Sequence, residues 1–447
     1  MKNTRLLINS AKKICLLISL LVLSSNYSYS GMDCRSMLGG YIKPLFGSKY
    51  VVGGIEVTGA FAGMTDRNIK NGLAIAGLGF NFNDSKHQIY VEGGYKNFYN
   101  SKGGPGRKGI DTSGAIGGYE QFPAVDKLKL SFRELFYKYD VPNFKVGIGL
   151  QTMKLPDYFL LDERVVGLNS SLSSGNFTYS VTAASVLAQF ARYADFCGTR
   201  HIYNLTRGRR VDFLGDYFGE SNFWAATVKW VNNPSENSQA TTENNSEDDE
   251  FEDFTPVEVS KPFLQEVGAI FYNEFGAAFP DYKYYGGLFA GFNLPLGINL
   301  KAEALYQYIY KENAVGYFVE LSKLFDLGNG FSSLVGAAMV GKIEIDSNTM
   351  FYPSYTNLFM GEVMKMDALD LPVAQAFVKF DFPWLDNMYF KTTVAGQTAG
   401  SHTKELDLEL SARFFNHLKT TLIGGYISSD ALKQDTYFGR IEFRVAF

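Results

Sequence analysis

Apolar and polar residues alternate strictly over stretches of about ten positions in this chain, and the pattern is clearest near the C-terminal end. Between positions 405 and 414, the apolar residues share one face of an extended strand and the polar residues share the other. The polar face carries Glu405, Asp407, Glu409, Ser411 and Arg413. Because a charged face suits a water-filled lumen better than a sandwich core, we expect the opposite face to meet lipid.

Segments with this two-residue period recur along the chain and number about eighteen, with sixteen as the alternative count. They are expected near 51–63, 72–82, 87–98, 113–121, 126–138, 143–153, 174–187, 222–231, 264–276, 283–293, 297–309, 314–325, 332–344, 373–382, 387–397, 403–415, 418–428 and 436–447. Very short turns, such as 83–86 and 416–417, alternate with longer connections, as in up-and-down barrels. The expected fold class is therefore all-β, a transmembrane antiparallel up-and-down β-barrel.

Four longer segments, 154–173, 188–221, 232–263 and 345–372, break the rhythm and are expected to be connections. The third begins with a polar, strongly acidic stretch near 232–255, which has too little apolar surface to order itself. Its carboxylates lack the glycine-punctuated spacing of a dedicated calcium loop. We therefore expect a disordered loop there, and neither a metal site nor a cofactor in the chain.

The start of the chain has the pattern of an export signal. Basic residues precede an apolar stretch from Ile14 to Leu23, and small residues follow. A spanning helix needs about 20 apolar residues, so this shorter stretch suits a cleavable signal peptide. The expected parts are a signal peptide at 1–30, a periplasmic N-terminal segment or small plug at 31–50, and an outer-membrane barrel at 51–447.

The composition favours a membrane barrel over a soluble β protein. Hydrophobic residues make up 46% of the chain, which contains 38 Phe and 28 Tyr. Such an excess of aromatic residues suits the girdles at the two interfaces of a membrane. A net charge of −4 gives no basic footprint for nucleic acid, which excludes nucleic acid as a partner.

The final segment carries the most specific signal in the chain. Tyr437, Phe443 and the terminal Phe447 share one apolar face of the expected strand, whereas Arg440 and Arg444 lie on the other. An alternating last strand that ends in Phe resembles the recognition signal of Gram-negative outer-membrane proteins. The alternative is an ordinary amphipathic edge strand. The resemblance implies assembly by the barrel-assembly machinery and a location in the bacterial outer membrane, among its lipid and lipopolysaccharide.

Catalytic chemistry has little support in the sequence. The chain contains 4 His, and neither a His-Glu-x-x-His zinc motif nor a Gly-x-Ser-x-Gly elbow is present. We therefore do not expect an enzyme, although some outer-membrane hydrolases assemble catalytic residues from separate strands. A basic run at 207–210 either faces lipopolysaccharide phosphates or an anionic solute, or is a solvated loop.

Several charged residues are candidates for lining a pore constriction. They are Arg133, Glu134, Asp162, Glu163, Arg164, Glu405, Asp407 and Glu409. The expected strand 126–138 breaks its alternation at Glu134, which predicts a β-bulge or an ion pair near a rim. The whole set either makes a selective site or solvates the barrel interior and fixes its register.

Three short segments resemble the alginate-export-like group of outer-membrane porins. They are 132–137, with an Arg-Glu pair, the Gly-rich 146–151, which ends in Gln, and 162–165, which contains Arg164. The resemblance implies that Arg133 and Arg164 are lumen cations on a path for anionic sugars. The acidic residues expected in the same lumen depart from a strongly cationic pore and argue against an alginate-like substrate.

The expected function is that of a porin: a single barrel through which small hydrophilic solutes, anions among them, diffuse passively. The alternatives are a surface-exposed barrel that acts as an adhesin or antigen, and a barrel for uptake of hydrophobic substrates. A TonB-dependent transporter is disfavoured because a large plug domain would precede its first strand, whereas alternation here begins near Val51. The sequence does not indicate an oligomeric state.

Cys34 and Cys197 form a candidate disulfide, since Cys15 would leave with the signal peptide. The periplasm is oxidising, and a bond requires Cα atoms within about 7 Å of each other. Counting strands back from a periplasmic C-terminus places 188–221 outside the cell, away from Cys34. A bond would then require the N-terminal segment to enter the lumen or a further strand near 211–218, so both outcomes stay open.

Overall fold

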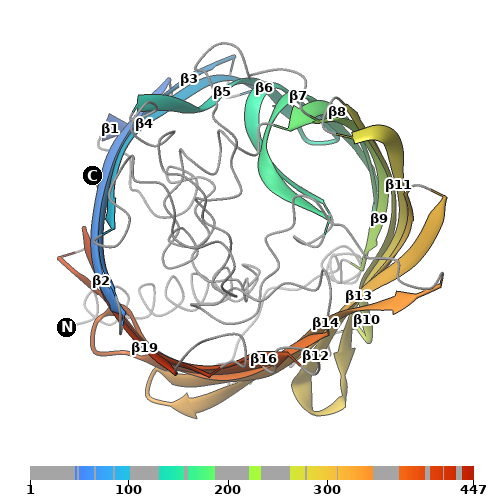
Figure 1. Ribbon diagram of the computed structural model, residues 1–447. Coiled ribbons are helices and arrows are strands. Elements are labelled where there is room, and N and C mark those ends of the chain that lie inside the picture. The colour runs from blue at the N-terminus through green and yellow to red at the C-terminus, as the bar shows by residue number, and fades with distance from the viewer. Residues whose placement is uncertain are drawn as a thin grey trace, which may run out of the picture.

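Strands with alternating faces pair into one closed, ring-shaped sheet in the computed structural model of the protein (Figure 1). The structure describes residues 46–47, 50–64, 67–83, 86–100, 130–155, 160–186, 221–232, 262–276, 279–309, 311–345, 372–397, 403–415, 417–428 and 435–446. The predicted signal peptide at 1–30 and the acidic stretch after residue 232 lie outside these residues.

Nineteen strands fall within the described residues. The first ten are β1 (Phe46–Gly47), β2 (Val51–Met64), β3 (Arg67–Phe82), β4 (His87–Asn100), β5 (Leu130–Val141), β6 (Phe144–Leu155), β7 (Leu161–Ser174), β8 (Phe177–Val186), β9 (Ser221–Val231) and β10 (Leu264–Gly276). The others are β11 (Phe279–Leu294), β12 (Ile298–Ile309), β13 (Glu312–Gly328), β14 (Phe331–Glu344), β15 (Val373–Phe382), β16 (Asp386–Gln397), β17 (Lys404–Phe414), β18 (Leu418–Ser428) and β19 (Thr436–Ala446). A 3₁₀ turn, Pro295–Gly297, joins β11 and β12. No helix of the described part is long and apolar enough to cross a membrane.

The barrel closes between its first and last long strands. Each strand from β2 to β19 pairs antiparallel with the next, and β19 completes the ring on β2 from Phe438 to Ala446. The two-residue β1 folds back on the start of β2. Closure leaves eighteen strands, β2 to β19, in the wall, which confirms the predicted fold class and strand number. It also pairs the backbone groups that lipid cannot satisfy.

An even number of antiparallel strands puts the start of β2 and the end of β19 at one end of the barrel, here called the terminal end. Connections at this end span 82–87, 141–144, 174–177, 231–264, 294–298, 328–331, 382–386 and 414–418. All of them except 231–264 are short. The opposite, distal end holds the other long connections, at 100–130, 186–221 and 344–373. This distribution matches the predicted alternation of short turns and longer loops.

Aromatic side chains form two belts on the outer wall. Near the distal end, the ring centroids of Trp224 and Phe271 are 4.9 Å apart, and Tyr284 contacts Phe271 in turn. At the terminal end, Phe382 stacks on Trp384 with centroids 5.2 Å apart. Exposed aliphatic residues occupy outward positions between the belts. Two belts with an apolar band between them are typical of a barrel that spans a membrane.

The largest difference from the sequence prediction lies between residues 101 and 176. The segment 154–173 contains most of β7, so its prediction as a connection was wrong. The expected strand at 113–121 falls outside the described residues. The terminal half of β7 is rich in serine, and Ser170 lies on the outer face beside Leu168 and Leu172, so its two faces differ too little to give a clear period.

Candidate functional site

Charged side chains lie on the inner side of the barrel wall. On β17, Glu405, Asp407 and Glu409 are 2%, 1% and 7% exposed, whereas their neighbours Leu406 and Leu408 are 40% and 45% exposed on the outer side. The same alternation puts Arg440, Glu442 and Arg444 of β19 inside. The wall therefore separates an apolar exterior from a charged interior.

Three basic residues stand side by side on the inner wall near the terminal end. Arg413 of β17 is the register partner of Lys419 on β18, which in turn is the partner of Arg444 on β19. Like charges directly opposite one another destabilise a sheet unless counter-charges offset them. Arg444 meets Glu56 of β2, Nε to Oε1 3.2 Å, and lies 3.8 Å from Glu442. We call Arg413, Lys419 and Arg444 the cation row.

Acidic and basic groups also mix on the neighbouring strands β15 to β17. Lys379 and Lys391 are register partners, and Lys379 pairs with Asp381, Nζ to Oδ1 2.6 Å. Lys391 lies opposite Glu409, whose Oε1 accepts a hydrogen bond of 2.6 Å from the Tyr389 hydroxyl. This part of the inner wall therefore carries charge of both signs.

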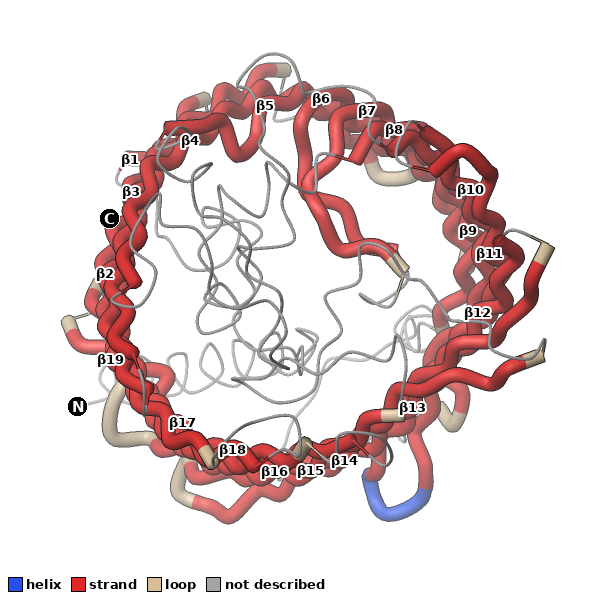
Figure 2. The backbone as a smooth tube through the Cα atoms, in the orientation of Figure 1, coloured by secondary structure: helices blue, strands red, loops and turns tan. Residues whose placement is uncertain are grey.

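The hairpin of β6 and β7 leaves the wall and bends into the lumen (Figure 2). Among the described residues, β6 pairs with β5 as far as Leu150, and β7 pairs with β8 only from Val165 onward. β6 and β7 nevertheless stay paired with each other up to Leu155 opposite Leu161. Residues 151–155 and 161–164 are therefore a two-stranded projection, here called the inward arm, and in the described ladders it joins the rest of the sheet at its base.

A glycine permits the bend at the base of the inward arm. Gly149 has a φ of +124°, and a Cβ atom on it would lie 2.3 Å from the Leu135 carbonyl oxygen. Any larger residue would therefore be strained and would clash with the backbone of β5. Gln151 braces the bend, because its Nε2 donates to the carbonyls of Gly147 and Gly167, each at 3.3 Å.

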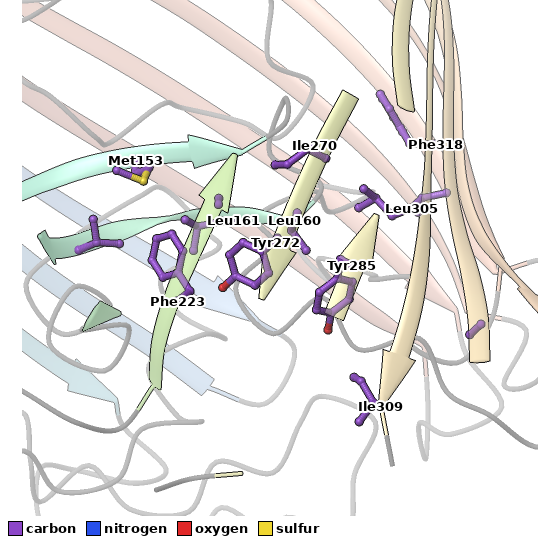
Figure 3. Packing of buried hydrophobic residues seen from close by; sticks show 14 of the residues in the cluster. Met153, Leu160, Leu161, Phe223, Ile270, Tyr272, Tyr285, Leu305, Ile309 and Phe318 are labelled. Carbon is purple, nitrogen blue, oxygen red and sulfur yellow. The ribbon is translucent and has the colours of Figure 1, made fainter. Parts of the chain in front are cut away.

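The far end of the inward arm packs on the inner wall through apolar side chains (Figure 3). Met153, Leu160 and Leu161 belong to one buried cluster with Phe223 of β9 and Tyr272 of β10. The rings of Phe223 and Tyr272 stack with centroids 5.0 Å apart. The arm therefore reaches from its base at β6 and β7 to the wall at β9 and β10, and it lies inside the ring of strands (Figure 2).

The inner wall of β7 and β8, together with Thr227 of β9, carries hydroxyl and amide groups in place of charge, and the strip ends at Lys229 of β9, which lies opposite Thr178 and pairs with Glu266 of β10. The inward positions of this hydroxyl sector are Asn169, Ser171, Ser173, Thr178, Ser180, Thr182 and Thr227. Thr182 donates to Asn169 Oδ1 at 3.1 Å, and the hydroxyls of Ser173 and Thr178 are 3.3 Å apart. Outward neighbours in the same strands, such as Val181, are exposed apolar residues. The lumen therefore has an uncharged polar strip beside charged ones.

The break in alternation at Glu134 coincides with a β-bulge. Glu134 of β5 pairs with Glu92 of β4, and Phe132 pairs with the next residue, Gly93, so Arg133 is the extra residue. A bulge was one of the two outcomes that the sequence predicted. It shifts the phase of β5 and brings the Glu134 carboxylate to the inner side, where it is 4% exposed.

Asp162, Glu163 and Arg164 lie on β7 within the inward arm. Asp162 is the register partner of Lys154, and Arg164 is that of Thr152. The structure thus spreads the candidate residues over β5, the arm and β17. Their common role in a constriction stays a prediction.

The assembly signal is described in part. Tyr437 and Phe443 are 66% and 39% exposed on the outer wall of β19. Phe447, Cys34 and Cys197 lie outside the described residues, so the assembly signal and the disulfide stay predictions.

The sequence analysis did not single out Lys419 or Glu56 as lumen residues. On β18, Lys419 shares its inward face with Ile423 and Ile427, which are 8% and 0% exposed. Both faces of β18 are therefore largely apolar, and alternation alone does not separate inside from outside. Within the described residues, no group of three or more His, Cys, Asp or Glu side chains could hold a metal ion.

The same architecture occurs in solved porins from Pseudomonas aeruginosa. OccK2 (OpdF), in complex with glucuronate, has a TM-score of 0.53 at 12% identity, covering 89% of this chain and 96% of that one. OpdQ has a TM-score of 0.51 at 11% identity, covering 89% and 98%. OccK8 (OprE) has a TM-score of 0.51 at 12% identity, covering 90% and 99%. No family model and no curated protein matches the chain. At these identities the likeness shows a shared barrel fold.

Proposed function

We propose that this protein is an outer-membrane channel through which small hydrophilic solutes, including anions, diffuse passively. The observation that carries the proposal is a closed barrel with an apolar outer wall, a charged inner wall and an arm that lies inside the ring of strands. A charged, water-filled lumen admits hydrated solutes, and charges near its narrow part bias which of them pass. The fold shared with outer-membrane porins supports this function.

The cation row supports a preference for anions. Arg413, Lys419 and Arg444 lie along one contour of the wall, and Arg133 and Arg164 are proposed as further lumen cations. The carboxylates of the same wall oppose this preference, so the selectivity is expected to be weak. Since OccK2 was solved with glucuronate, small sugar acids are suitable solutes for a first test.

The proposal includes a route to the membrane and an orientation. Residues 1–30 would direct export, residues 31–50 would follow as a periplasmic segment or small plug, and the barrel-assembly machinery would insert the barrel. The terminal end would face the periplasm, because short turns lie on that side of outer-membrane barrels. The distal loops would then meet lipopolysaccharide.

Planar-bilayer recording of the purified protein tests the channel function. We expect steady ionic current from single insertions, because the lumen holds charge and water. Heat-unfolded protein is the control. A sealed barrel would reject the channel and would favour the adhesin or antigen alternative.

One observation favours the hydrophobic-uptake alternative. The buried cluster at the arm continues along the inner wall through apolar residues of β12 to β15, which include Leu305, Phe318, Val340 and Val373. Such a strip could guide an apolar solute. A fluorescent fatty-acid analogue that binds the purified barrel saturably would support this alternative, and a conducting barrel that binds none would exclude it.

A further inference from the structure

We infer that the apolar contact at the far end of the inward arm positions the charged segment 162–164 of the arm, the proposed selectivity filter, so that Leu161, Phe223 and Tyr272 set selectivity without touching the solute. This contact is called the latch. The inference rests on the proposed channel function and assigns residues that hold the filter in place.

The inward arm is held at two places. At its base, the bend at Gly149 and the hydrogen bonds of Gln151 fix the direction in which it leaves the wall. Between base and tip, the described ladders pair its two strands with each other, since the ladders to β5 and β8 have ended. The latch is therefore the second point that fixes where the arm lies.

The sequence of the arm disfavours a structure in which its two strands continue within the barrel wall. Ile148 and Leu168 are register partners on the outer face, 52% and 41% exposed. If both strands continued straight, alternation would carry positions 152, 154, 162 and 164 to this face. These positions are Thr, Lys, Asp and Arg, and charged residues on a lipid-facing surface are destabilising.

The same alternation explains why the tip docks on β9 and β10. Leu161 and Val165 are both 0% exposed and belong to the cluster that contains Phe223 and Tyr272. Positions 162 and 164 fall on the opposite face of the strand from Leu161 and Val165. Docking one face on the wall therefore fixes where the charged positions stand across the pore.

The position of an arm that is held by apolar contacts is expected to depend little on salt concentration. Salt screens ion pairs at an exposed surface, whereas burial of apolar area does not depend on attraction between charges. The arm is thus expected to keep its position when the salt concentration of the medium changes. Loss of apolar volume should release it.

Neighbouring residues with opposite orientation provide matched variants. Phe223→Ala and Leu161→Ala remove latch volume, whereas Trp224→Ala and Leu168→Ala remove similar volume from the outer faces of the same two strands. We expect the latch variants to show larger single-channel conductance, more current noise and an anion-to-cation permeability ratio shifted toward unity. Phe223→Leu should largely restore the native values, and the outer-face variants should keep them.

A cross-link measures the docking independently of conductance. In a background with Cys34→Ser and Cys197→Ser, Leu161→Cys combined with Phe223→Cys places two thiols in the latch. We expect a short bifunctional maleimide to link them in folded barrels and to leave conductance close to the native level. Leu168→Cys combined with Phe223→Cys, on opposite faces of the wall, is the control that should not link.

Each result has a distinct meaning. Native conductance and permeability ratio in folded Phe223→Ala would overturn the inference, and so would failure of the latch thiols to link more than the control. If the alanine variants of the latch do not fold, the cross-link in the cysteine variant decides. A native barrel that conducts no current would reject the channel function, while the cross-link would still report whether the arm is docked.

Discussion

A single backbone conformation at Gly149 decides where the hairpin of β6 and β7 leaves the wall. Its φ of +124° is one that residues with a side chain rarely adopt, and the Leu135 carbonyl fills the space that a Cβ would need. A bend at this position turns a wall hairpin into an inward arm. The direction in which the arm leaves the wall thus depends on a residue without a side chain.

We predict that Gly149→Ala destabilises the barrel by about 1–3 kcal/mol through backbone strain at this position. Denaturant unfolding in lipid vesicles, followed by tryptophan fluorescence, measures the change in free energy. The matched control is Gly424→Ala, because a Cβ there would meet nothing within 4 Å. Equal stability of the two variants would contradict the strain argument.

The cation row makes a second prediction at the scale of single residues. Replacing Arg413 and Lys419 by Gln removes two like charges from adjacent strands, so the permeability ratio should shift toward cations. Reversal potentials in a salt gradient measure this ratio. Lys404→Gln is the control, since Lys404 lies on the exposed, outward side of β17.

Arg133→Ala with Arg164→Ala tests the residues that the sequence predicted. A shift in the same direction would place them in the conducting path. If the ratio stays at its native value, these residues only solvate the interior or fix register.

At the scale of strands, the sequence predicted strand bounds best where one face of the strand is apolar and points outward and the other is polar and points inward. β17 shows this in full, with carboxylates inside and leucines outside, and its predicted and observed bounds nearly coincide. β7 was missed because its wall half is serine-rich and its arm half leaves the wall and docks on β9 and β10. Alternation reports contact with lipid, so an element that folds away from the wall gives no such signal.

We predict that β19 is required for assembly, because its outer face exposes Tyr437 and Phe443 in the alternating pattern that we expect the assembly machinery to recognise. Replacing Phe443 and Phe447 by Ser should leave unfolded, protease-sensitive protein in the periplasm. Loss of the heat-modifiable band in gel electrophoresis is the measurement. Leu408→Ser is the control for a polar residue on the lipid face of another strand, where Leu408 is 45% exposed. Normal migration of the β19 variant would count against the signal.

At the scale of the molecule, the closed ring fixes which turns share a side. β12 and β13 connect at the distal end between Ile309 and Glu312, and β13 and β14 connect at the terminal end between Gly328 and Phe331. These turns are similarly short and differ in their side of the membrane. The orientation of the protein can therefore be read from them.

We predict that an epitope inserted after Lys311 is detected by antibody on intact cells, whereas the same epitope after Asn329 is detected only after the outer membrane is permeabilised. Both residues adopt positive φ at turn tips, so the two insertions disturb similar backbone. The reverse pattern would mean that the terminal end faces outward.

The overall shape was predictable from the sequence, whereas the organisation of the lumen was only partly so. Closure and most of the strands follow from a local period, and the strand number agrees although β7 was missed and the expected strand at 113–121 lies outside the described residues. The latch depends on a buried cluster that brings Leu161 together with residues more than sixty positions away, such as Phe223, and no local sequence pattern predicts such a long-range association. The bulge at Arg133 could be predicted in part. The break in alternation indicates its position, but the sequence does not indicate which side chains the bulge brings to the inner side.

The hydroxyl sector gives the pore two electrical environments in one cross-section. Mobile counter-ions collect against the charged strands in a layer of about 8 Å at physiological ionic strength, and that layer thins as salt rises. Along β7 and β8, the inward positions from Asn169 to Thr182 carry no charge to gather such a layer. Ion flow should therefore respond to ionic strength, while a neutral solute that moves along the hydroxyls, exchanging hydrogen bonds with them, should cross at a rate that salt leaves unchanged.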